Sequence, residues 1–183
     1  MMSFSELITK RQSVRRYESR AVEDEKIMQC LESARLSPSA SNSQPWHFVV
    51  VNREPLRTEV ARATFTEIKL INKFTLQAPM LVVIVQEKPK LITRLAMQVK
   101  GKEWPLIDIG IAATHFCLKA TELGLGTCMI GWFDETRIKE VLNIPGGKTI
   151  GLLISVGYPP ADYPLRTKVR KQPDSMMSFN KYP

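Results

Sequence analysis

The segment RQSVRRY, residues 11–17, holds an alternating row of polar residues, Arg11, Ser13 and Arg15. In an extended backbone, side chains two positions apart point to the same side, so these side chains would form one face. Two guanidinium groups and a hydroxyl can donate charge-assisted hydrogen bonds to a phosphate. The pattern is short, and ordinary exposed arginines are the alternative.

The formal net charge of +8 at pH 7 suggests nucleic-acid binding as one possibility. The basic residues, however, include two short clusters near the two ends, at 10–20 and 166–171, and no predicted helix carries a continuous basic face. Aromatic residues do not alternate with these charges. We therefore expect no nucleic-acid partner. The two clusters either converge on one small anion or are solvated chain ends.

A second chemical segment, SPSASNSQPWHF, begins at Ser37. Ser37 precedes Pro38, which disfavours the α conformation and predicts the end of a helix. The hydroxyl, amide and small side chains of residues 39–44 could hydrogen-bond the edge of a heteroaromatic ring. The apolar run at 47–51 then predicts a buried strand. An ordinary polar loop before a strand is the alternative.

Side chains for catalysis without a cofactor are scarce. The chain has only two histidines, His47 and His115, and its three cysteines, Cys30, Cys117 and Cys128, are far apart. This pattern predicts no disulfide framework and no metal site, and it is typical of a reducing compartment. No apolar run approaches the roughly 20 residues that span a bilayer, and the first residues do not resemble a signal peptide. We expect a cytoplasmic protein whose cofactor carries the chemistry.

The elements that must position these residues follow from apolar periodicity and capping signals. The 183 residues, 44% of them hydrophobic, suffice for one domain with a sizeable core. Ser3 and Glu6 form a capping box, and Asn52 and Asp134 are expected as further N-caps. Strands are predicted at 47–51, 81–85, 125–131 and 149–156, and helices at 4–11, 23–37, after Asn52, at 105–123 and after Asp134.

The helix at 105–123 is apolar on nearly every side, so it is either central or shared with a second subunit. The last residues include Met176, Met177, Phe179 and Tyr182. An apolar tail end usually lies on another surface. Both features favour a homodimer.

At this point the sequence resembles the FMN-dependent nitroreductase family of NAD(P)H-using flavoproteins. The resemblance rests on RQSVRRY at 11–17, PSASNSQPWHF at 38–48, GLGTCMIG at 124–131 and the basic pair Lys168 and Arg170. It implies an α+β fold, a three-layer α/β/α sandwich with a mainly antiparallel central sheet and helices on both faces. It also implies a single domain, residues 1–183, and a homodimer in which the tail 160–183 extends onto the partner.

The resemblance also implies the site. The FMN phosphate, ribityl chain and ring edge would be held by the Arg11–Arg15 segment with the C-terminal basic pair, and Arg15 would stabilise negative charge on the reduced ring. The loop at 38–42, with Gln44, would pack on the isoalloxazine, often from the partner subunit, and 129–132 would lie near N5. Asn72 and Lys73 are one position out of register and are not included. The implied cofactor-binding residues are Arg11, Gln12, Ser13, Arg15, Pro38, Ser39, Ala40, Ser41, Asn42, Gln44, Met129, Ile130, Gly131, Trp132, Lys168 and Arg170.

The implied activity is a two-electron transfer from NADH or NADPH through FMN to a nitroaromatic, quinone or similar small-molecule acceptor, by a ping-pong mechanism. No side chain is expected to act as a nucleophile, and no metal or membrane is involved. A related flavoenzyme that carries out reductive dehalogenation or flavin breakdown is the alternative, as is a flavin-binding protein without activity.

Overall fold

The computed structural model describes residues 2–66 and 71–182 of the chain. Its strands form one sheet in the order β1-β2-β4-β3, and every pair of neighbours is antiparallel. The strands are β1 (Trp46–Val51), β2 (Met80–Gln86), β3 (Gly126–Ile130) and β4 (Thr149–Gly157). The helices are α1 (Phe4–Lys10), α2 (Asp24–Arg35), α3 (Leu56–Arg62), α4 (Leu91–Lys100), α5 (Trp104–Glu122) and α6 (Glu135–Val141). Short 3-10 turns are η1 (Ala40–Asn42), η2 (Lys73–Gln77) and η3 (Pro173–Ser175).

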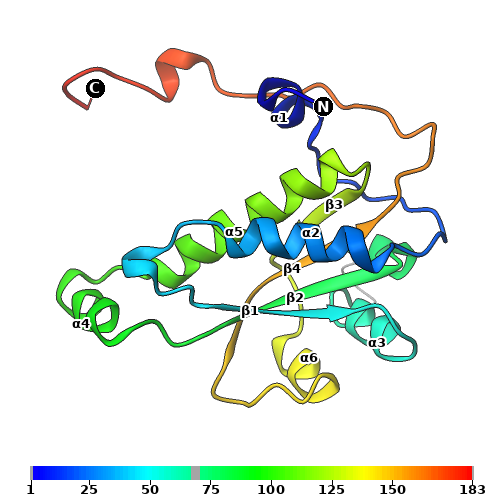
Figure 1. The fold of residues 1–183 in the computed structure, drawn as a ribbon, viewed down its shortest axis with the longest axis horizontal. Coiled ribbons are helices and arrows are strands. Elements are labelled where there is room, and N and C mark those ends of the chain that lie inside the picture. Colours follow the sequence, from blue (N-terminus) through cyan, green and yellow to red (C-terminus); the bar gives the residue numbers. More distant parts are fainter. Residues whose placement is uncertain (1, 67–70, 183) are drawn as a thin grey trace.

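Helices cover both faces of the sheet (Figure 1). Alternate residues of β2 point to opposite faces, so Val82 packs in the core with α2 and α5, and Val83 packs in the core with α3 and α6. The largest fully buried side chain, Phe116 of α5, lies in the first of these cores. The α+β fold with helices on both faces of an antiparallel sheet is confirmed.

Two helices begin at the capping residues that the sequence indicated. Ser3 and Glu6 form the predicted capping box, and the side chain of Asp134 accepts a hydrogen bond from the N–H of Arg137 at 3.0 Å. The prediction for Asn52 is wrong. The N-cap of α3 is Pro55, which makes no side-chain capping bond, so the helix begins one turn later than the sequence signal indicated.

The burial predicted for the first strand is also wrong. β1 is an edge strand, and of its residues only Val51 is fully buried, while His47 is exposed. The unbroken apolar run at 47–51 had predicted a strand inside the sheet. β2 lies inside the sheet, and its residues Met80 to Val85 are buried, as the sequence predicted.

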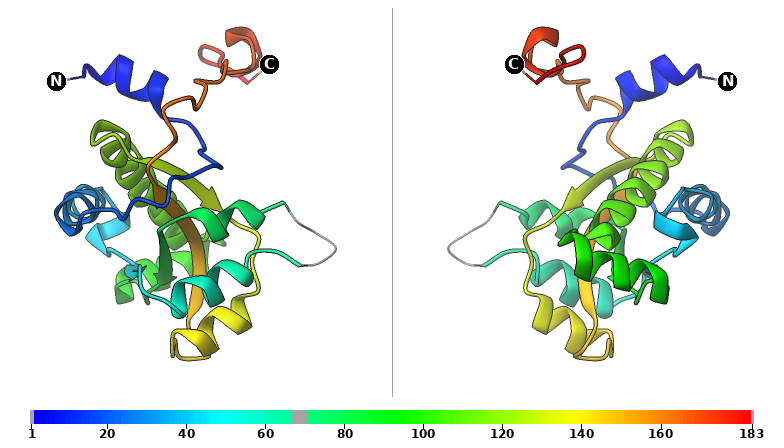
Figure 2. Two further views of the ribbon diagram at one scale, coloured as in Figure 1. Left: turned by 90° about the vertical axis from the view of Figure 1, so that its right-hand side faces the viewer. Right: turned by 90° about the vertical axis from the view of Figure 1, so that its left-hand side faces the viewer.

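α1 and the C-terminal tail lie at the same end of the molecule and project from the rest of the chain (Figure 2). α5 is not covered on every side by this one chain, because Leu106 and Ile107 are 48% and 56% exposed. In the described residues, no helix is long and apolar enough to cross a membrane.

Candidate functional site

The basic N-terminal segment runs beside the edge strand β3. Ser13 forms an isolated parallel bridge with Thr127, and the N–H of Val14 donates to the carbonyl of Thr127 at 2.9 Å. A glycine is required opposite this contact, because a Cβ on Gly126 would lie 2.7 Å from a methyl carbon of Val14. The sequence GLG at 124–126 therefore allows the segment to approach the strand closely.

A buried tyrosine fixes the end of the same segment. The Tyr17 hydroxyl donates to the carbonyl of Val14 at 2.8 Å and lies 2.7 Å from the Ser155 hydroxyl of β4. Burial raises the pKa of Tyr17, so the phenol stays protonated and available as a donor. The backbone between Ser13 and Tyr17 is thus attached to both β3 and β4.

The C-terminal segment lies against these residues. The Lys168 ammonium donates to the carbonyl of Arg11 at 2.6 Å. The Gln12 carboxamide donates to the carbonyl of Pro164 and accepts from the N–H of Arg166, each at 3.0 Å. The two basic segments of the sequence, separated by about 150 residues, are therefore brought together.

The electrostatics of this contact favour an anion. Partial burial lowers the pKa of Lys168, and the neighbouring charges of Arg11 and Arg170 lower it further. In the part of the chain that the structure describes, no ion pair joins Arg11, Lys168 or Arg170 to a carboxylate. We call these three residues the cation cluster. Like charges this close are unfavourable unless an anion neutralises them.

Arg15 lies next to the cation cluster and beside β3. Its backbone N–H donates to the Tyr163 hydroxyl at 2.9 Å, and the same hydroxyl accepts from the guanidinium of Arg166 at 3.0 Å. Burial raises the pKa of the Cys128 thiol, and the adjacent Arg15 and Ser13 side chains oppose that rise. Both side chains thus lie beside one residue of β3, as expected for a row on one face.

The segment 129–132 ends β3 and begins the following loop. Met129 and Trp132 are 38% and 51% exposed, whereas Ile130 is buried. The Asn72 carboxamide donates to the Trp132 carbonyl at 3.1 Å and to the Thr64 carbonyl at 3.0 Å. Asn72 therefore holds the end of this segment in place, although the sequence analysis left it out of the site.

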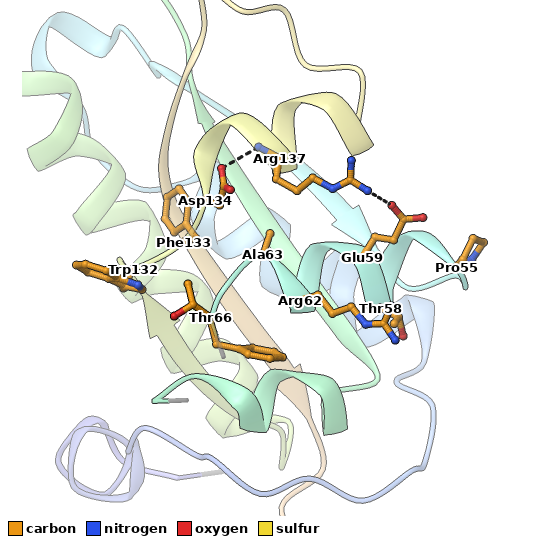
Figure 3. Close-up of a pocket in the computed structure, with 11 residues that line it drawn as sticks. Pro55, Thr58, Glu59, Arg62, Ala63, Thr66, Trp132, Phe133, Asp134 and Arg137 are labelled. Atoms are coloured by element: carbon orange, nitrogen blue, oxygen red, sulfur yellow. Dashed lines mark hydrogen bonds and ion pairs between the residues drawn. The ribbon is translucent and has the colours of Figure 1, made fainter. Parts of the chain in front are cut away.

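Trp132 also lines a hollow between α3 and the start of α6 (Figure 3). Phe65 and Phe133 contribute further apolar surface, and Arg137 pairs with Glu59 across the hollow at 2.9 Å. Trp132, the last residue of the segment 129–132, therefore has one side open to this hollow.

The polar loop lies elsewhere. η1 contacts α4 and α5, where the N–H of Ala40 donates to the carboxylate of Asp108 and the hydroxyls of Ser43 and Thr93 lie 2.8 Å apart. The charge of Arg11 opposes the rise that burial causes in the pKa of the Cys117 thiol, so Arg11 lies near this residue of α5. The cation cluster is therefore toward the other end of α5 from the loop. Figure 1 shows α4 near the start of α5 and α1 near its C-terminal end.

A single subunit thus brings together only part of the predicted set. Arg11, Gln12, Ser13 and Arg15 lie with Lys168 and Arg170 at the edge of β3, and Ser13 and Arg15 lie beside Cys128, the residue before the segment 129–132. The loop residues Pro38, Ser39, Ala40, Ser41, Asn42 and Gln44 form a separate group. Asp108 and Cys117, which mark the two groups, are nine positions apart on α5, or about 13 Å along its axis.

Sequence reasoning missed three residues that contact the predicted groups. They are Asn72 beside Trp132, Arg166 beside Gln12 and Asp108 beside Ala40 of the loop. A signal for Asp108 was present, because a carboxylate interrupts the apolar run of the 105–123 helix. In the described residues, no group of three or more His, Cys, Asp or Glu side chains could hold a metal ion.

The cations gathered at this edge of the sheet have no paired carboxylate among the described residues, an arrangement whose electrostatics favour an anionic group. Residues 8–158 match the model of the nitroreductase family. A relative from Archaeoglobus fulgidus, an NADH dehydrogenase/NAD(P)H nitroreductase by name only, is 34% identical over 158 residues, covering 84% of this chain and 83% of the relative. The chain belongs to the nitroreductase family, and its class is that of the flavin oxidoreductases.

Two further similarities describe the range of the family. An iodotyrosine deiodinase from Thermotoga neapolitana is 25% identical over 173 residues, which cover 87% of this chain and 90% of the deiodinase. The solved structure of an FMN-dependent nitroreductase from Clostridium difficile R20291 has a TM-score of 0.75 and 26% identity, and the match covers 96% of this chain and 98% of that one.

Proposed function

We propose that this protein binds FMN at the edge of β3 and transfers two electrons from NADH or NADPH to a nitroaromatic, quinone or similar acceptor. The observation that carries the proposal is the cation cluster, in which Lys168 contacts Arg11, the charge of Arg170 lowers its pKa, and none of the described carboxylates pairs with it. A phosphate monoester supplies the missing negative charge and accepts several charge-assisted hydrogen bonds.

The donor set fits the phosphate end of FMN. Arg11 and Arg170 would donate to phosphate oxygens, and Lys168 would add charge while its contact with the Arg11 carbonyl fixes the segment. Bound phosphate would also remove the repulsion that lowers the pKa of Lys168. Ser13, which is attached to β3 next to this group, would donate its hydroxyl to the ribityl chain.

The ring would then lie along the C-terminal end of β3. Arg15, held by Tyr163, is placed beside Cys128 and would stabilise negative charge at the ring edge. The partly exposed Met129 and Trp132 would give this end apolar contact, and Asn72 would keep the Trp132 carbonyl in position.

The loop at 38–44 would come from a second subunit, because contacts within one chain hold it toward the other end of α5. The exposed Leu106 and Ile107 on α5 and the exposed Met176 and Phe179 of the tail provide apolar surface for such a homodimer. The partner's tail would cover surface that one chain leaves open. We place this assembly in the cytoplasm, in line with three free cysteines.

When bound, FMN supplies the two-electron redox chemistry. In the overall reaction with a quinone, NAD(P)H provides two electrons and one proton, solvent provides a second proton, and the products are NAD(P)⁺ and the quinol. The protein's own residues hold the phosphate, orient the ring and adjust its charge. None of them is required to act as a nucleophile.

Nicotinamide and acceptor would both need the same open face of the ring, so they should bind in turn. The test is the initial velocity across a grid of NAD(P)H and quinone concentrations. Parallel double-reciprocal lines are expected for this ping-pong scheme. Intersecting lines would contradict it, and a flavin that binds without any turnover would indicate a carrier rather than an enzyme.

A second candidate function is reductive dehalogenation, because the similarity to the Thermotoga deiodinase covers most of both chains. A halogenated tyrosine would need its carboxylate and ammonium recognised in addition to its ring. Parallel assays with a quinone and with an iodotyrosine distinguish the two. The proposed function predicts faster turnover of the quinone, and the opposite ratio would favour the alternative.

A further inference from the structure

The loop at 39–44 is held in an unfavourable backbone conformation. Ser41, Asn42 and Gln44 have φ values of 52°, 50° and 47°, all in the left-handed region. Asparagine tolerates this region, but serine and glutamine seldom adopt it. Such strain persists only where surrounding contacts hold it, and it is concentrated at functional sites.

The contact that begins this turn comes from a buried carboxylate. The N–H of Ala40, the first residue of η1, lies 3.1 and 3.2 Å from the two carboxylate oxygens of Asp108. Asp108 is the fifth residue of α5, so it does not cap its own helix, and it is only 4% exposed. Ser39 is the N-cap of η1 but makes no side-chain capping bond. Asp108 of α5 instead accepts the hydrogen bond from the first N–H of the turn.

Burial of this carboxylate is costly for the fold. Desolvation raises the pKa of Asp108, and the hydrogen bond from Ala40 only partly opposes that rise. Its neighbours Ile107 and Ile109 are apolar, and a leucine would suit such a helix better. The presence of Asp108 at this buried position is therefore better explained by its contact with Ala40 than by a contribution to the stability of the fold.

Contacts from α4 complete the support. The hydroxyl of Ser43 lies 2.8 Å from that of Thr93, and the Lys90 ammonium donates to the carbonyl of Ser41 at 3.4 Å. Within the turn, the N–H of Gln44 donates to the Ser39 hydroxyl at 2.9 Å. These contacts fix the far end of the turn, while Asp108 fixes its beginning.

We propose that Asp108 is a positioning residue, whose carboxylate holds Ala40 and the left-handed turn that follows in the shape that packs on the flavin of the partner subunit. This inference rests on the proposed function, which places the loop against FMN. Asp108 acts through the loop and does not touch the cofactor itself.

The first test compares three variants of the full-length protein. Asp108→Leu removes the acceptor with similar volume, Asp108→Asn keeps one carbonyl oxygen for the Ala40 N–H, and Glu122→Leu removes a carboxylate at the other end of α5. We expect Asp108→Leu to weaken FMN binding about tenfold or more, because the charge-assisted hydrogen bond that holds the loop is lost and binding must then order the loop at a similar cost. Asp108→Asn should recover most of that affinity, and Glu122→Leu should bind like the wild type.

Affinity is measured by quenching of free FMN fluorescence, and stability by urea unfolding of the apoproteins. The apo form of Asp108→Leu should unfold at a urea concentration no lower than the wild type, because a buried charge is removed. Wild-type affinity in Asp108→Leu would overturn the inference. Equal loss in Asp108→Asn and Asp108→Leu would overturn the role of the acceptor oxygen. A wild type that binds no FMN would instead overturn the proposed function.

A mixed dimer tests whether the loop acts on the partner's site. Asp108→Leu subunits are co-expressed with subunits carrying Arg11→Ala and Arg170→Ala, and the mixed dimers are isolated with two affinity tags. If the loop acts across the dimer, one site combines an intact cation cluster with an intact loop, so about half of the sites keep FMN. If neither site keeps FMN, the loop acts within its own subunit and this part of the inference is wrong.

Discussion

The double variant Arg11→Ala, Arg170→Ala tests the cation cluster. In the described residues, neither guanidinium takes part in an ion pair. The Lys168 ammonium contacts the backbone carbonyl of Arg11, which alanine retains. Removal of both side chains therefore leaves no buried partner without a hydrogen bond, and the protein should still fold.

The expected loss of affinity follows from the contacts. A hydrogen bond to a charged group contributes roughly 1.5–3 kcal/mol, so two such groups contribute about 3–6 kcal/mol. Arg11 is half-buried and Arg170 exposed, which places the effect near the lower limit because solvent screens it. A loss of about 3 kcal/mol corresponds to a dissociation constant about a hundredfold higher. The pKa of Lys168 should also rise, because two like charges that lower it are gone.

The assay is titration of the apoprotein with FMN at several salt concentrations. The wild type should lose affinity as salt increases, and the double variant should be weaker and less sensitive to salt. Arg53→Ala combined with Lys100→Ala removes the same charge at two exposed residues outside the site and serves as the control. Full flavin affinity in the double variant, or an equal loss in the control, would refute the cation cluster as the phosphate site.

Two other predictions concern assembly and pH. The segment 172–183 exposes Met176, Met177 and Phe179, and its deletion should weaken the dimer and the binding of FMN. A protein that is monomeric by light scattering and still retains its flavin would contradict this. A hydrogen bond from Tyr158 is the main cause that lowers the pKa of Glu23 from 4.5 to about 2. That contribution to stability is full above pH 4.5 and is lost as the pH falls toward 2. Tyr158→Phe should therefore cost stability in urea unfolding at pH 7 and less at pH 2, and an equal deficit at both would show that the bond to ionised Glu23 does not matter.

Local signals in the sequence predicted most elements because their causes lie within a few residues. The capping box of Ser3 and Glu6 and the cap at Asp134 were each readable. The prediction that Asn52 caps the next helix was wrong because a good capping residue does not by itself decide where a helix begins. Here the first turn of α3 follows Pro55.

The order of the strands and the exposure of β1 were not readable, since both depend on contacts distant in the chain. An apolar run indicates that a surface is covered, but it does not show which part of the same chain or of another subunit covers it. Within one subunit, His47 is exposed and the residues at 48–50 are only half-buried, so most of this apolar run is not covered. The same limit applies to Leu106 and Ile107 of α5.

In the site, residue types were readable and their grouping was not. The alternation of Arg11, Ser13 and Arg15 predicted a shared face, and the two basic segments were expected to converge on an anion. The resemblance implied that the loop often comes from the partner subunit, and the structure adds the contact with Asp108 that holds the loop apart from the cluster around Lys168. The carboxylate of Asp108 in an apolar run was a signal for the residue, but its partner, a backbone N–H 68 positions away, was not readable from the sequence.

The central claim, that this protein holds FMN and reduces it with a nicotinamide nucleotide, is tested most directly by anaerobic titration of the purified, FMN-loaded protein with NADH and with NADPH. We expect one of the two nucleotides to remove the absorbance of oxidised flavin completely at one equivalent per site, and one equivalent of quinone to restore it. Flavin that stays oxidised with both nucleotides, or protein that cannot be loaded with FMN, would refute this function.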